Sequence, residues 1–439
     1  MRTKEYYQDL YKQKLTTAEA IAKQIQSNDI CAGPSALGEP QAIMDALAER
    51  AAKGEITGVE HHMLLAVRKW KYLEPEMAGK IKHVSWFTSG NARAAISEGR
   101  ADYLPNYYYE VPRLWTEFVK PNVAYAMVSP MDAHGYFSFG VGASEPRSQM
   151  ERADKVFIEV NPNMPRIHGN NFVHISEVDA ICESNMPLPT MPPAELSEKD
   201  LKIGQYVAER IPNGACVQLG IGGMPNAVGK YLMDKKDLGI HTEMFTGSML
   251  DLIEAGAVNN SKKNINRLKS VAAFSVGTKE TYDYLNDNPA VEFHPVSYTN
   301  DPRIICQNDY MISINACVEV DLIGQVCAES VGPRNISGTG GQVDFVRGAN
   351  WSKGGRAYIC MYSTATIKGN TVSKITATLA PGAHVTTTKG DIDAIVTEYG
   401  VAELKGKTAA QRAKALIAIA HPDFRDQLLA DAKKLNLMV

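Results

Sequence analysis

The sequence lacks an excess of charge of either sign, and it lacks long hydrophobic runs. Its 439 residues carry 46 Lys and Arg against 49 Asp and Glu, which gives a formal net charge of −3. Without a basic field to hold a phosphate backbone, no nucleic-acid partner is expected. The longest apolar runs are strand-sized, about 5–8 residues, whereas a helix that spans a bilayer needs roughly 20. We therefore expect no membrane partner either.

Cysteines are few and show no pairing pattern, with seven in the whole chain. They occur at positions 31, 182, 216, 306, 317, 327 and 360, without a CxxC pair or a nearby histidine cluster. This scatter argues against a disulfide framework and against a zinc site, so no bound metal is expected. The N-terminal stretch MRTKEYYQDLYKQKL is charged and contains no apolar signal region. Together these features indicate a cytoplasmic protein with reduced thiols.

What the sequence does contain is an internal repeat. Residues 21–47 and 207–232 each show a helix, a turn, a short apolar strand, a glycine-containing loop with a proline, and a second helix. The two copies lie about 186 residues apart, and further on MDAHGYFSFGVG matches VDLIGQVCAESVG, which pairs Asp132 with Asp321. An offset this steady predicts an α/β fold of two similar tandem domains, with mostly parallel sheets covered by helices.

A proline-rich segment, CESNMPLPTMPPAELSEKD, separates the two copies. Its prolines are Pro187, Pro189, Pro192 and Pro193. They forbid a continuous helix or a central strand and favour an extended linker. We therefore expect a first domain over residues 1–185 and a second domain over residues 196–439. The second domain is expected to end in helices, the first of which begins with a capping-box pattern at Thr408 and Gln411.

A glycine cluster lies between an apolar strand and a helix in ACVQLGIGGMPNAV. Gly220, Gly222 and Gly223 allow positive φ angles and close approach of a ligand, and amides at a helix start suit an anion or an oxyanion. Pro225 stands where the dinucleotide-binding pattern GxGxxG needs its third glycine, and no GK[ST] of a phosphate-binding loop follows. A purely structural turn is the alternative interpretation.

A second glycine cluster lies in GPRNISGTGGQVDFVRGANW. Gly338, Gly340 and Gly341 fall within four residues, just before the dipeptide DF. A flexible surface loop is the alternative to a ligand-binding loop here. The segment follows an apolar strand pair and carries little charge, whereas a solvated loop usually carries more, which favours a functional loop.

A single carboxylate stands out in LGIHTEMFTGSM, where Glu243 is surrounded by apolar residues, threonine, serine and glycine. A strand end that points into water, or a helix cap, would also explain it. In a strand, His241 would face the same side as Glu243, and we interpret this histidine as structural rather than as a base. Glu60 in ITGVEHH, at an offset of 183, is an alternative carboxylate from the first repeat.

Six stretches together resemble the acetyl-CoA hydrolase/transferase family, the class I coenzyme A transferases. They are DAHGYFSFG, LGIGGMPNAV, LGIHTEMFTG, EVDLIGQV, GTGGQVDF and TEYGVAELKGKT. The resemblance spans almost the whole chain, and it is closest to the branch that moves CoA between butyryl or 4-hydroxybutyryl groups and acetate. It implies a CoA-transferase whose catalytic glutamate matches Glu243.

The resemblance also implies roles for the glycine clusters and for two further residues. The segment formed by Gly220, Ile221, Gly222, Gly223 and Met224 matches a CoA-contacting loop, with the backbone of Ile221 at the oxyanion hole. A second loop that contacts CoA matches Gly338, Gly340 and Gly341, and Gly341 completes the hole. Asn315 in ISINACVEVDL matches an asparagine that helps to hold the thioester, and Lys368 in STATIKG matches a CoA-contacting lysine.

A glutamate suits CoA transfer because it is a carboxylate nucleophile. It attacks the acyl-CoA carbonyl to give a mixed anhydride, and the CoA thiolate then attacks the glutamyl carbonyl to give a glutamyl-CoA thioester. With an ordinary pKa of about 4.3, a glutamate is ionised at neutral pH and needs no base. The expected partners are acyl-CoA and short-chain carboxylates, with CoA thioesters as substrates and no permanently bound cofactor. We expect a homodimer or a homotetramer.

Several alternatives stay open from the sequence. A 4-hydroxybutyrate CoA-transferase and an acyl-CoA hydrolase would share the fold and the glutamate, since a transferase that admits water becomes a hydrolase. A non-catalytic CoA-binding protein would share the loops without turnover. An NAD-dependent dehydrogenase that uses GIGG is disfavoured by Pro225.

Overall fold

The computed structural model describes residues 3–192 and 194–438, so Pro193 of the expected linker lies outside the described residues. The chain divides into two compact units. Unit 1 comprises Met1–Met191, Glu243–Phe245 and Val271–Thr299, and unit 2 comprises Pro192–Thr242, Thr246–Ser270 and Asn300–Val439. The boundaries 1–185 and 196–439 stay a prediction. The compact units are divided differently, because two later segments of the chain join unit 1.

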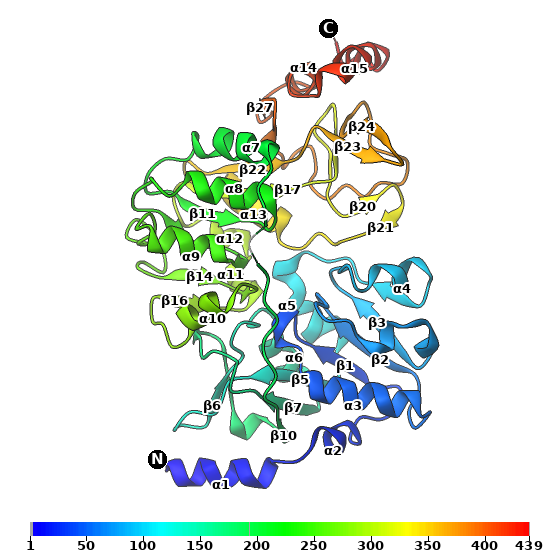
Figure 1. The fold of residues 1–439 in the computed structure, drawn as a ribbon, viewed down its shortest axis with the longest axis vertical. Coiled ribbons are helices and arrows are strands. Elements are labelled where there is room, and N and C mark those ends of the chain that lie inside the picture. The colour runs from blue at the N-terminus through cyan, green and yellow to red at the C-terminus, as the bar shows by residue number, and fades with distance from the viewer. Residues whose placement is uncertain (1–2, 193, 439) are drawn as a thin grey trace. The chain divides into compact units, whose positions relative to one another are not determined.

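Unit 1 is built on a seven-stranded sheet in which neighbouring strands run parallel (Figure 1). In spatial order the strands are β10 (Ala180–Glu183), β7 (Lys155–Val160), β5 (Val123–Val128), β1 (Ile30–Gly33), β2 (Val59–Met63), β3 (Ile81–Ser85) and β4 (Ala101–Tyr103). Helices α2 (Ala18–Ala22) and α3 (Gln41–Ala52) pack on one face of this sheet, and α6 (Pro146–Arg152) packs on the other. The sheet is therefore covered on both faces.

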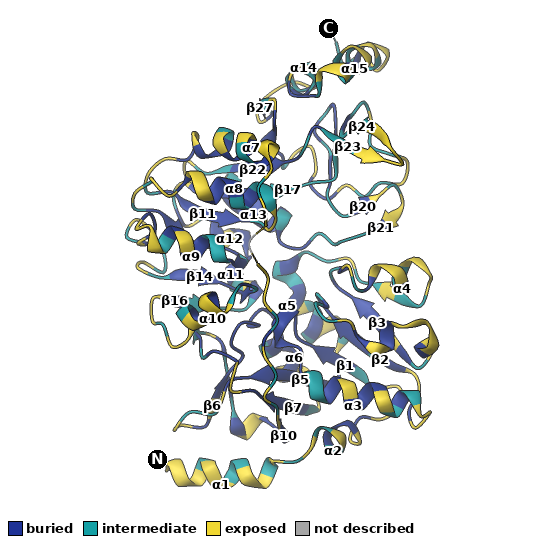
Figure 2. Ribbon diagram, viewed as in Figure 1, coloured by how far each residue is buried: buried dark blue, intermediate teal, exposed yellow. Residues whose placement is uncertain are grey.

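Strand β5 shows why such segments form a buried sheet. All six of its residues, VAYAMV, are buried. Val123 and Tyr125 pack in the core beneath α3, whereas Ala124 and Ala126 belong to the core on the opposite face. Successive side chains of a strand point to opposite faces, so a strand covered on both sides is a continuous apolar run. Figure 2 shows β5 in dark blue and helix α1 (Lys4–Lys14), which has no buried residue, mainly in yellow.

Shorter elements complete unit 1. The strands are β6 (Tyr136–Ser138), β8 (His168–Gly169), β9 (Phe172–His174), β13 (Met244–Phe245), β15 (Phe274–Ser275) and β16 (Val291–Phe293), and β14 (Ser270–Ala272) lies at its border. The helices are α4 (Arg93–Ser97), α5 (Val111–Arg113), α10 (Lys279–Leu285) and α11 (Val296–Thr299), with helical turns that include η1 (Ala36–Gly38) and η4 (Tyr108–Glu110). Strand β13 pairs with β15, and β16 pairs with β8. These backbone bonds hold the two later segments in unit 1.

Unit 2 is built on a six-stranded sheet, parallel except for its last strand. In spatial order the strands are β12 (Gly239–Ile240), β11 (Cys216–Leu219), β17 (Met311–Ala316), β22 (Arg356–Cys360), β26 (Ala394–Thr397) and β27 (Gly400–Glu403). Helices α7 (Glu198–Ala208), α8 (Gly223–Tyr231) and α13 (Gln342–Trp351) pack against it. The helices of unit 2 also include α9 (Gly247–Glu254), α12 (Pro302–Ile305), α14 (Ala409–Ala418) and α15 (Pro422–Lys434). The short strands of unit 2 are β18 (Glu319–Asp321), β19 (Val326–Cys327), β20 (Ser330–Val331), β21 (Arg334–Asn335), β23 (Thr364–Ile367), β24 (Asn370–Ser373) and β25 (Ile375–Thr376).

The two sheets repeat one strand order. The series β10-β7-β5-β1-β2 in unit 1 corresponds to β26-β22-β17-β11-β12 in unit 2. The expectation of two similar α/β domains with mostly parallel sheets is therefore confirmed. In each sheet the chain order reverses beside the first strand, between β1 and β5 and between β11 and β17. Open α/β sheets bind ligands beyond the carboxyl ends of their strands at such reversal points, which indicates where a site should be sought.

Candidate functional site

Glu243 lies in a bend between β12 and β13, where the chain enters unit 1. Its main-chain carbonyl accepts hydrogen bonds from the amides of Ala273 and Phe274, at 2.9 and 3.2 Å. These two bonds hold the backbone at Glu243, and the residue itself is half-buried. The helix-cap alternative is wrong, because the N-cap of α9 is Thr246. Glu243 is therefore a carboxylate on a backbone segment fixed by sheet bonds.

Strand register decides whether Glu60 is the first repeat's copy of Glu243. In unit 1, Ile30 of β1 lies opposite Glu60 of β2. The equivalent of Ile30 in unit 2, 186 residues later, is Cys216, and it lies opposite Gly239 of β12. The counterpart of Glu60 is thus Gly239, four residues before Glu243. The offset of 183 paired Glu60 with the wrong residue, because the connection from β1 to β2 in unit 1 is longer than the connection from β11 to β12 in unit 2.

Three polar residues of unit 1 escaped the sequence analysis. Glu145 and Ser35 are buried, and the hydroxyl of Ser35 donates a short hydrogen bond to Oε1 of Glu145. Tyr108 is also buried and packs in the same apolar core as Met244, the residue that follows Glu243. Burial, and next the charges of Glu145 and Glu243, raise the pKa of Tyr108 well above its ordinary value. One signal was available in the sequence: Glu145 lies among small and apolar residues in FSFGVGASEP, as Glu243 lies in its own stretch.

The first glycine cluster follows β11 and begins helix α8. The amide of Gly220 donates to the carbonyl of Ile314 at 2.9 Å, while Ile221 is 59% exposed. Gly222 is the N-cap of α8 with φ 106° and ψ −175°, a conformation open essentially to glycine alone. A Cβ atom on Gly223 would lie 2.8 Å from an oxygen of Asp200, so this glycine is required by close packing. Met224 is half-buried in the first turn of α8, whose amides lack partners within the helix.

Asn315 lies beside this loop at the end of β17. Strands β11 and β17 are neighbours, and Leu219 just before the loop pairs with Ile314. The side-chain amide of Asn315 donates to Ser313 Oγ at 2.8 Å and to Gln218 Oε1 at 3.2 Å. Unit 2 therefore brings Asn315 and the first glycine cluster together at the reversal point of its sheet.

The second glycine cluster precedes helix α13, which packs against β17 and β22. Gly341 is the N-cap of α13 with φ −91°, an ordinary value. Gly340 is buried and has φ 52°, and Gly338 is half-buried. Lys368 is exposed at the tip of the β23–β24 hairpin, where it forms a two-residue turn with Gly369. Both turn residues have positive φ, as such hairpin turns require, so a structural role already explains this pair.

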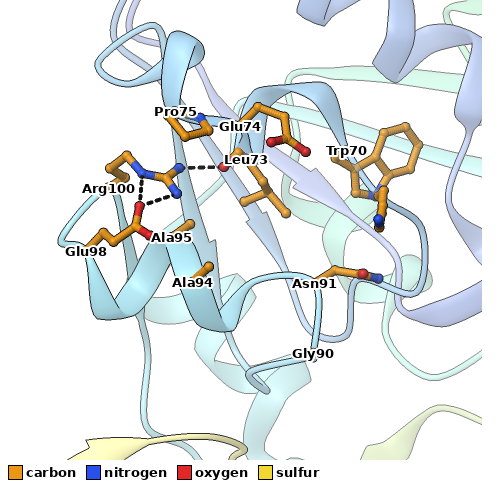
Figure 3. Close-up of a pocket in the computed structure, with 11 residues that line it drawn as sticks. Trp70, Leu73, Glu74, Pro75, Gly90, Asn91, Ala94, Ala95, Glu98 and Arg100 are labelled. Atoms are coloured by element: carbon orange, nitrogen blue, oxygen red, sulfur yellow. Dashed lines mark hydrogen bonds and ion pairs between the residues drawn. The ribbon is translucent and has the colours of Figure 1, made fainter.

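A pocket of about 290 Å³ beside helix α4 is a separate feature of unit 1 (Figure 3). Its polar lining includes Lys69, Asn91 and Arg100, which could suggest a phosphate site. The guanidinium of Arg100, however, lies 2.6 and 2.8 Å from the carboxylate of Glu98 and also donates to the carbonyl of Leu73. Because its charge is already balanced, and none of the residues matched to the family lines this pocket, it is not the candidate site.

Two further findings limit what kind of functional site the described residues can form. Across residues 3–192 and 194–438, no three His, Cys, Asp or Glu side chains gather in a way that could hold a metal ion. In that same part of the chain, each helix is too short or too polar to cross a bilayer.

Comparisons with known proteins give the family of this chain. The family model for the acetyl-CoA hydrolase/transferase N-terminal domain matches residues 1–192, and the model for the C-terminal domain matches residues 277–432. The chain is 46% identical over 435 residues to a succinyl-CoA:cyclohexane-1-carboxylate CoA transferase from Geobacter metallireducens, covering 99% of this chain and 98% of that protein. It is 43% identical over 446 residues to a butyryl-CoA:acetate CoA-transferase from Anaerostipes caccae, covering 98% of each chain.

A solved structure gives the same result for the fold. The crystal structure of RipA from Yersinia pestis matches with a TM-score of 0.93 and 41% sequence identity, covering 98% of this chain and 100% of that one. The resemblance that was inferred from the six sequence stretches is confirmed, and none of these matches supports an NAD-dependent dehydrogenase. The chain belongs to the acetyl-CoA hydrolase/transferase family and is a CoA-transferase enzyme.

Proposed function

We propose that the protein transfers CoA from a short-chain acyl-CoA to acetate, with butyryl-CoA and acetate giving butyrate and acetyl-CoA as the favoured reaction. The similarity to the butyryl-CoA:acetate CoA-transferase of Anaerostipes caccae supports this substrate pair. The chain is similar over an equal length to a relative named for cyclohexane-1-carboxylate, so this acid is included among the acceptors to be tested. A 4-hydroxybutyrate CoA-transferase and an acyl-CoA hydrolase are the alternatives within the family.

The observation that carries the mechanism is the half-buried carboxylate of Glu243 on a backbone fixed by two main-chain hydrogen bonds. In the proposed reaction Glu243 attacks the acyl carbonyl and expels CoA thiolate, which leaves a mixed anhydride. The thiolate then attacks the glutamyl carbonyl, so that the first acid departs as a carboxylate and Glu243 carries CoA as a thioester. An incoming acetate reverses these steps and leaves with the CoA.

Each attack creates an oxyanion that needs hydrogen-bond donors. We assign this task to the main-chain amides of Ile221, which directly precedes the N-cap of α8, and of Gly341, which is the N-cap of α13, since the start of a helix favours a negative charge. Loss of one such donor typically costs about 3–4 kcal/mol of transition-state stabilisation. Asn315 is assigned to hold the thioester, because its amide is oriented by Ser313 and Gln218.

The remaining matched residues are assigned to CoA itself. They are Gly220, Gly222, Gly223, Met224, Gly338, Gly340 and Lys368. The positive φ of Gly222 and of Gly340 supports a close backbone approach to a ligand. The lysine contributes a mobile charge suited to a CoA phosphate, because it is exposed on a hairpin tip. CoA thioesters act as substrates in this proposal, and no permanently bound cofactor is involved.

A trapping experiment tests the nucleophile. The enzyme is incubated with butyryl-CoA without acceptor, and borohydride is added, which reduces a thioester but not a free carboxylate. A glutamyl thioester becomes an alcohol, so the peptide that contains LGIHTEMFTGSM should lose about 14 Da at Glu243. The variant Glu243→Ala should show neither turnover nor mass loss. Mass loss at Glu60, or at neither glutamate, would overturn the assignment.

Product analysis separates the alternatives in function. Butyryl-CoA is supplied with and without acetate, and free CoA, acetyl-CoA and butyrate are measured. A transferase forms acetyl-CoA only when acetate is present, whereas a hydrolase releases free CoA in both cases. Parallel assays with 4-hydroxybutyrate and cyclohexane-1-carboxylate as acceptors rank the acids.

We also propose a cytoplasmic location and a homodimer or homotetramer. The seven cysteines are all free thiols in the structure, as suits a reducing compartment. Light scattering on purified protein measures the subunit count, and a monomer at working concentration would contradict this part of the proposal.

A further inference from the structure

Asp200 is a buried carboxylate of unit 2 that has no role in the reaction proposed above. It is 2% exposed and lies in the first turn of α7. Its Oδ2 atom accepts hydrogen bonds from the main-chain amide of Ser197 at 2.9 Å and from the hydroxyl of Ser197 at 2.6 Å. Its Oδ1 atom accepts a hydrogen bond from the hydroxyl of Tyr362 at 2.7 Å. Three donors therefore hold both oxygens of this carboxylate in place.

Helices α7 and α8 pack closely against each other in unit 2 (Figure 1). A Cβ atom added to Gly223 of α8 would lie 2.8 Å from Oδ1 of Asp200 in α7. A Cβ atom added to Gly204 of α7 would lie 2.7 Å from the main-chain carbonyl carbon of Ala227 in α8. The two contacts are four residues apart on each helix, so the helices run in the same direction and their first turns lie next to each other.

The carboxylate of Asp200 lies where two helices begin. Ser197 is the N-cap of α7, and Gly223 is the first residue of α8. The first amides of a helix lack intrahelical partners, and the helix dipole makes this end positive. A carboxylate that contacts both first turns therefore stabilises them together and fixes one relative to the other.

The place where α8 begins also determines the position of the Ile221 amide. On one side of Ile221, the amide of Gly220 is hydrogen-bonded to strand β17. On the other side, Gly222 is the extended N-cap of α8, and Gly223 then contacts Asp200. Ile221 itself is 59% exposed, so packing of its own side chain holds it little. A shift of the first turn of α8 would therefore move the Ile221 amide.

We propose that Asp200 is a positioning residue for the oxyanion site: held by Ser197 and Tyr362, its carboxylate fixes the first turn of α8 and, through it, the main-chain amide of Ile221. The inference rests on the proposed function, in which this amide binds the oxyanion. The oxyanion forms during the reaction and is absent from the bound substrate. A displaced donor therefore lowers kcat and leaves KM unchanged.

Two substitutions of Asp200 test the inference. Asp200→Ala removes the contact with Gly223, and we expect kcat to fall by about 10- to 100-fold with an unchanged KM for butyryl-CoA, because a small misplacement of a catalytic group is costly. Asp200→Asn keeps the shape of the side chain and all three hydrogen bonds, since a tyrosine hydroxyl also accepts, and should keep most of kcat. Rates are expressed per Glu243 thioester trapped with borohydride after long incubation, so that unfolded protein is not counted.

Two controls separate positioning from stability. Thr408→Ala removes the capping box of α14, as Asp200→Ala removes that of α7, and should lower Tm without changing kcat. Tyr362→Phe removes one donor to Asp200 and should lower kcat by a smaller factor than Asp200→Ala. Tyr358→Phe is its matched control, because within the described part of the chain the hydroxyl of Tyr358 has no hydrogen-bond partner, and kcat should not change.

The outcomes distinguish this inference from the proposed function. Absence of a thioester at Glu243 in the unaltered protein overturns the proposed function. An unchanged kcat in Asp200→Ala, a rise in KM without a fall in kcat, or an equal loss of kcat in Asp200→Asn overturns only the inference. If Asp200→Ala does not fold, Tyr362→Phe decides, and a kcat equal to that of Tyr358→Phe refutes the role of Asp200.

Discussion

Replacing Gly222 by alanine tests whether the loop before α8 works through its backbone. Gly222 has φ 106° and ψ −175°, and a Cβ atom placed there would meet no described atom within 4 Å. Any effect of Gly222→Ala therefore arises from backbone conformation or from the space that a ligand needs, and not from a clash in the folded protein. This separates it from Gly223, where an added Cβ would collide with Asp200 at 2.8 Å.

The expected magnitude follows from that conformation. An alanine held in this region costs about 1–3 kcal/mol, so the loop either keeps its shape at this cost or relaxes to another shape. Relaxation would move the amide of Ile221 from its assigned place, and loss of one oxyanion donor typically lowers kcat by about 100- to 1000-fold. We expect a fall in kcat of that order for Gly222→Ala, with a decrease in Tm of only a few degrees, about 2–4 °C per kcal/mol.

The matched control is Gly406→Ala. Gly406 has φ 74°, is also in unit 2, and would likewise offer a Cβ atom no described neighbour within 4 Å. It should lower Tm by a similar amount and leave kcat unchanged. Steady-state assays with butyryl-CoA and acetate, together with thermal unfolding, measure both quantities. Full kcat in Gly222→Ala would refute the assignment of this loop, and an equal loss of kcat in Gly406→Ala would show that lowered stability alone explains the effect.

Three further predictions concern acid stability, packing and kinetics. Burial lowers the pKa of His83 from 6.5 to about 3, so the folded state keeps it neutral while the unfolded state binds a proton below pH 6.5. The stability that depends on neutral His83 is therefore lost as pH falls from 6.5 towards 3, by about 2 kcal/mol at pH 5, and urea unfolding at pH 7 and pH 5 should show a smaller loss for His83→Leu. Gly169→Ala should abolish folding, because its Cβ atom would lie 2.2 Å from the carbonyl oxygen of Phe293 at φ 105°, and a soluble variant with unchanged circular dichroism would contradict this. Varying acetate at several butyryl-CoA concentrations should give parallel double-reciprocal lines, and intersecting lines with product removed would exclude a covalent enzyme intermediate.

Much of the fold could be predicted because the signals are local or repeated. The repeat offset predicted two sheets of similar order, and the apolar run of β5 is typical of a strand buried on both faces. The capping box at Thr408 and Gln411 begins helix α14 as predicted. The places of Glu243–Phe245 and Val271–Thr299 could not be predicted, since they depend on pairing between strands far apart in sequence.

Residues of the candidate site could be predicted only where they lie within a local sequence motif. Glycine and lone-carboxylate patterns pointed to Gly222 and Glu243, and the structure shows why the first must be glycine. The small and apolar residues around Glu145 were a local signal, but its hydrogen-bond partner Ser35 lies 110 residues away and could not be predicted from the local sequence. The register of Glu60 likewise required the strand pairing, because the two copies of the repeat differ in connection length.

Two later segments of the chain belong to unit 1, and this limits where recombination with the gene of a relative could take place. A recombination event that replaced residues 1–191 with those of a relative would mix two parents within one apolar core, because Met244, Phe274 and Val296 of that core lie later in the chain. A recombination breakpoint in the proline-rich segment would thus take side chains that pack together from two different parents. A chimera that kept each core from a single parent would have to carry residues 243–245 and 271–299 along with residues 1–191, while residues 246–270 stayed with the second half. The two halves are therefore best inherited together, although each has its own sheet.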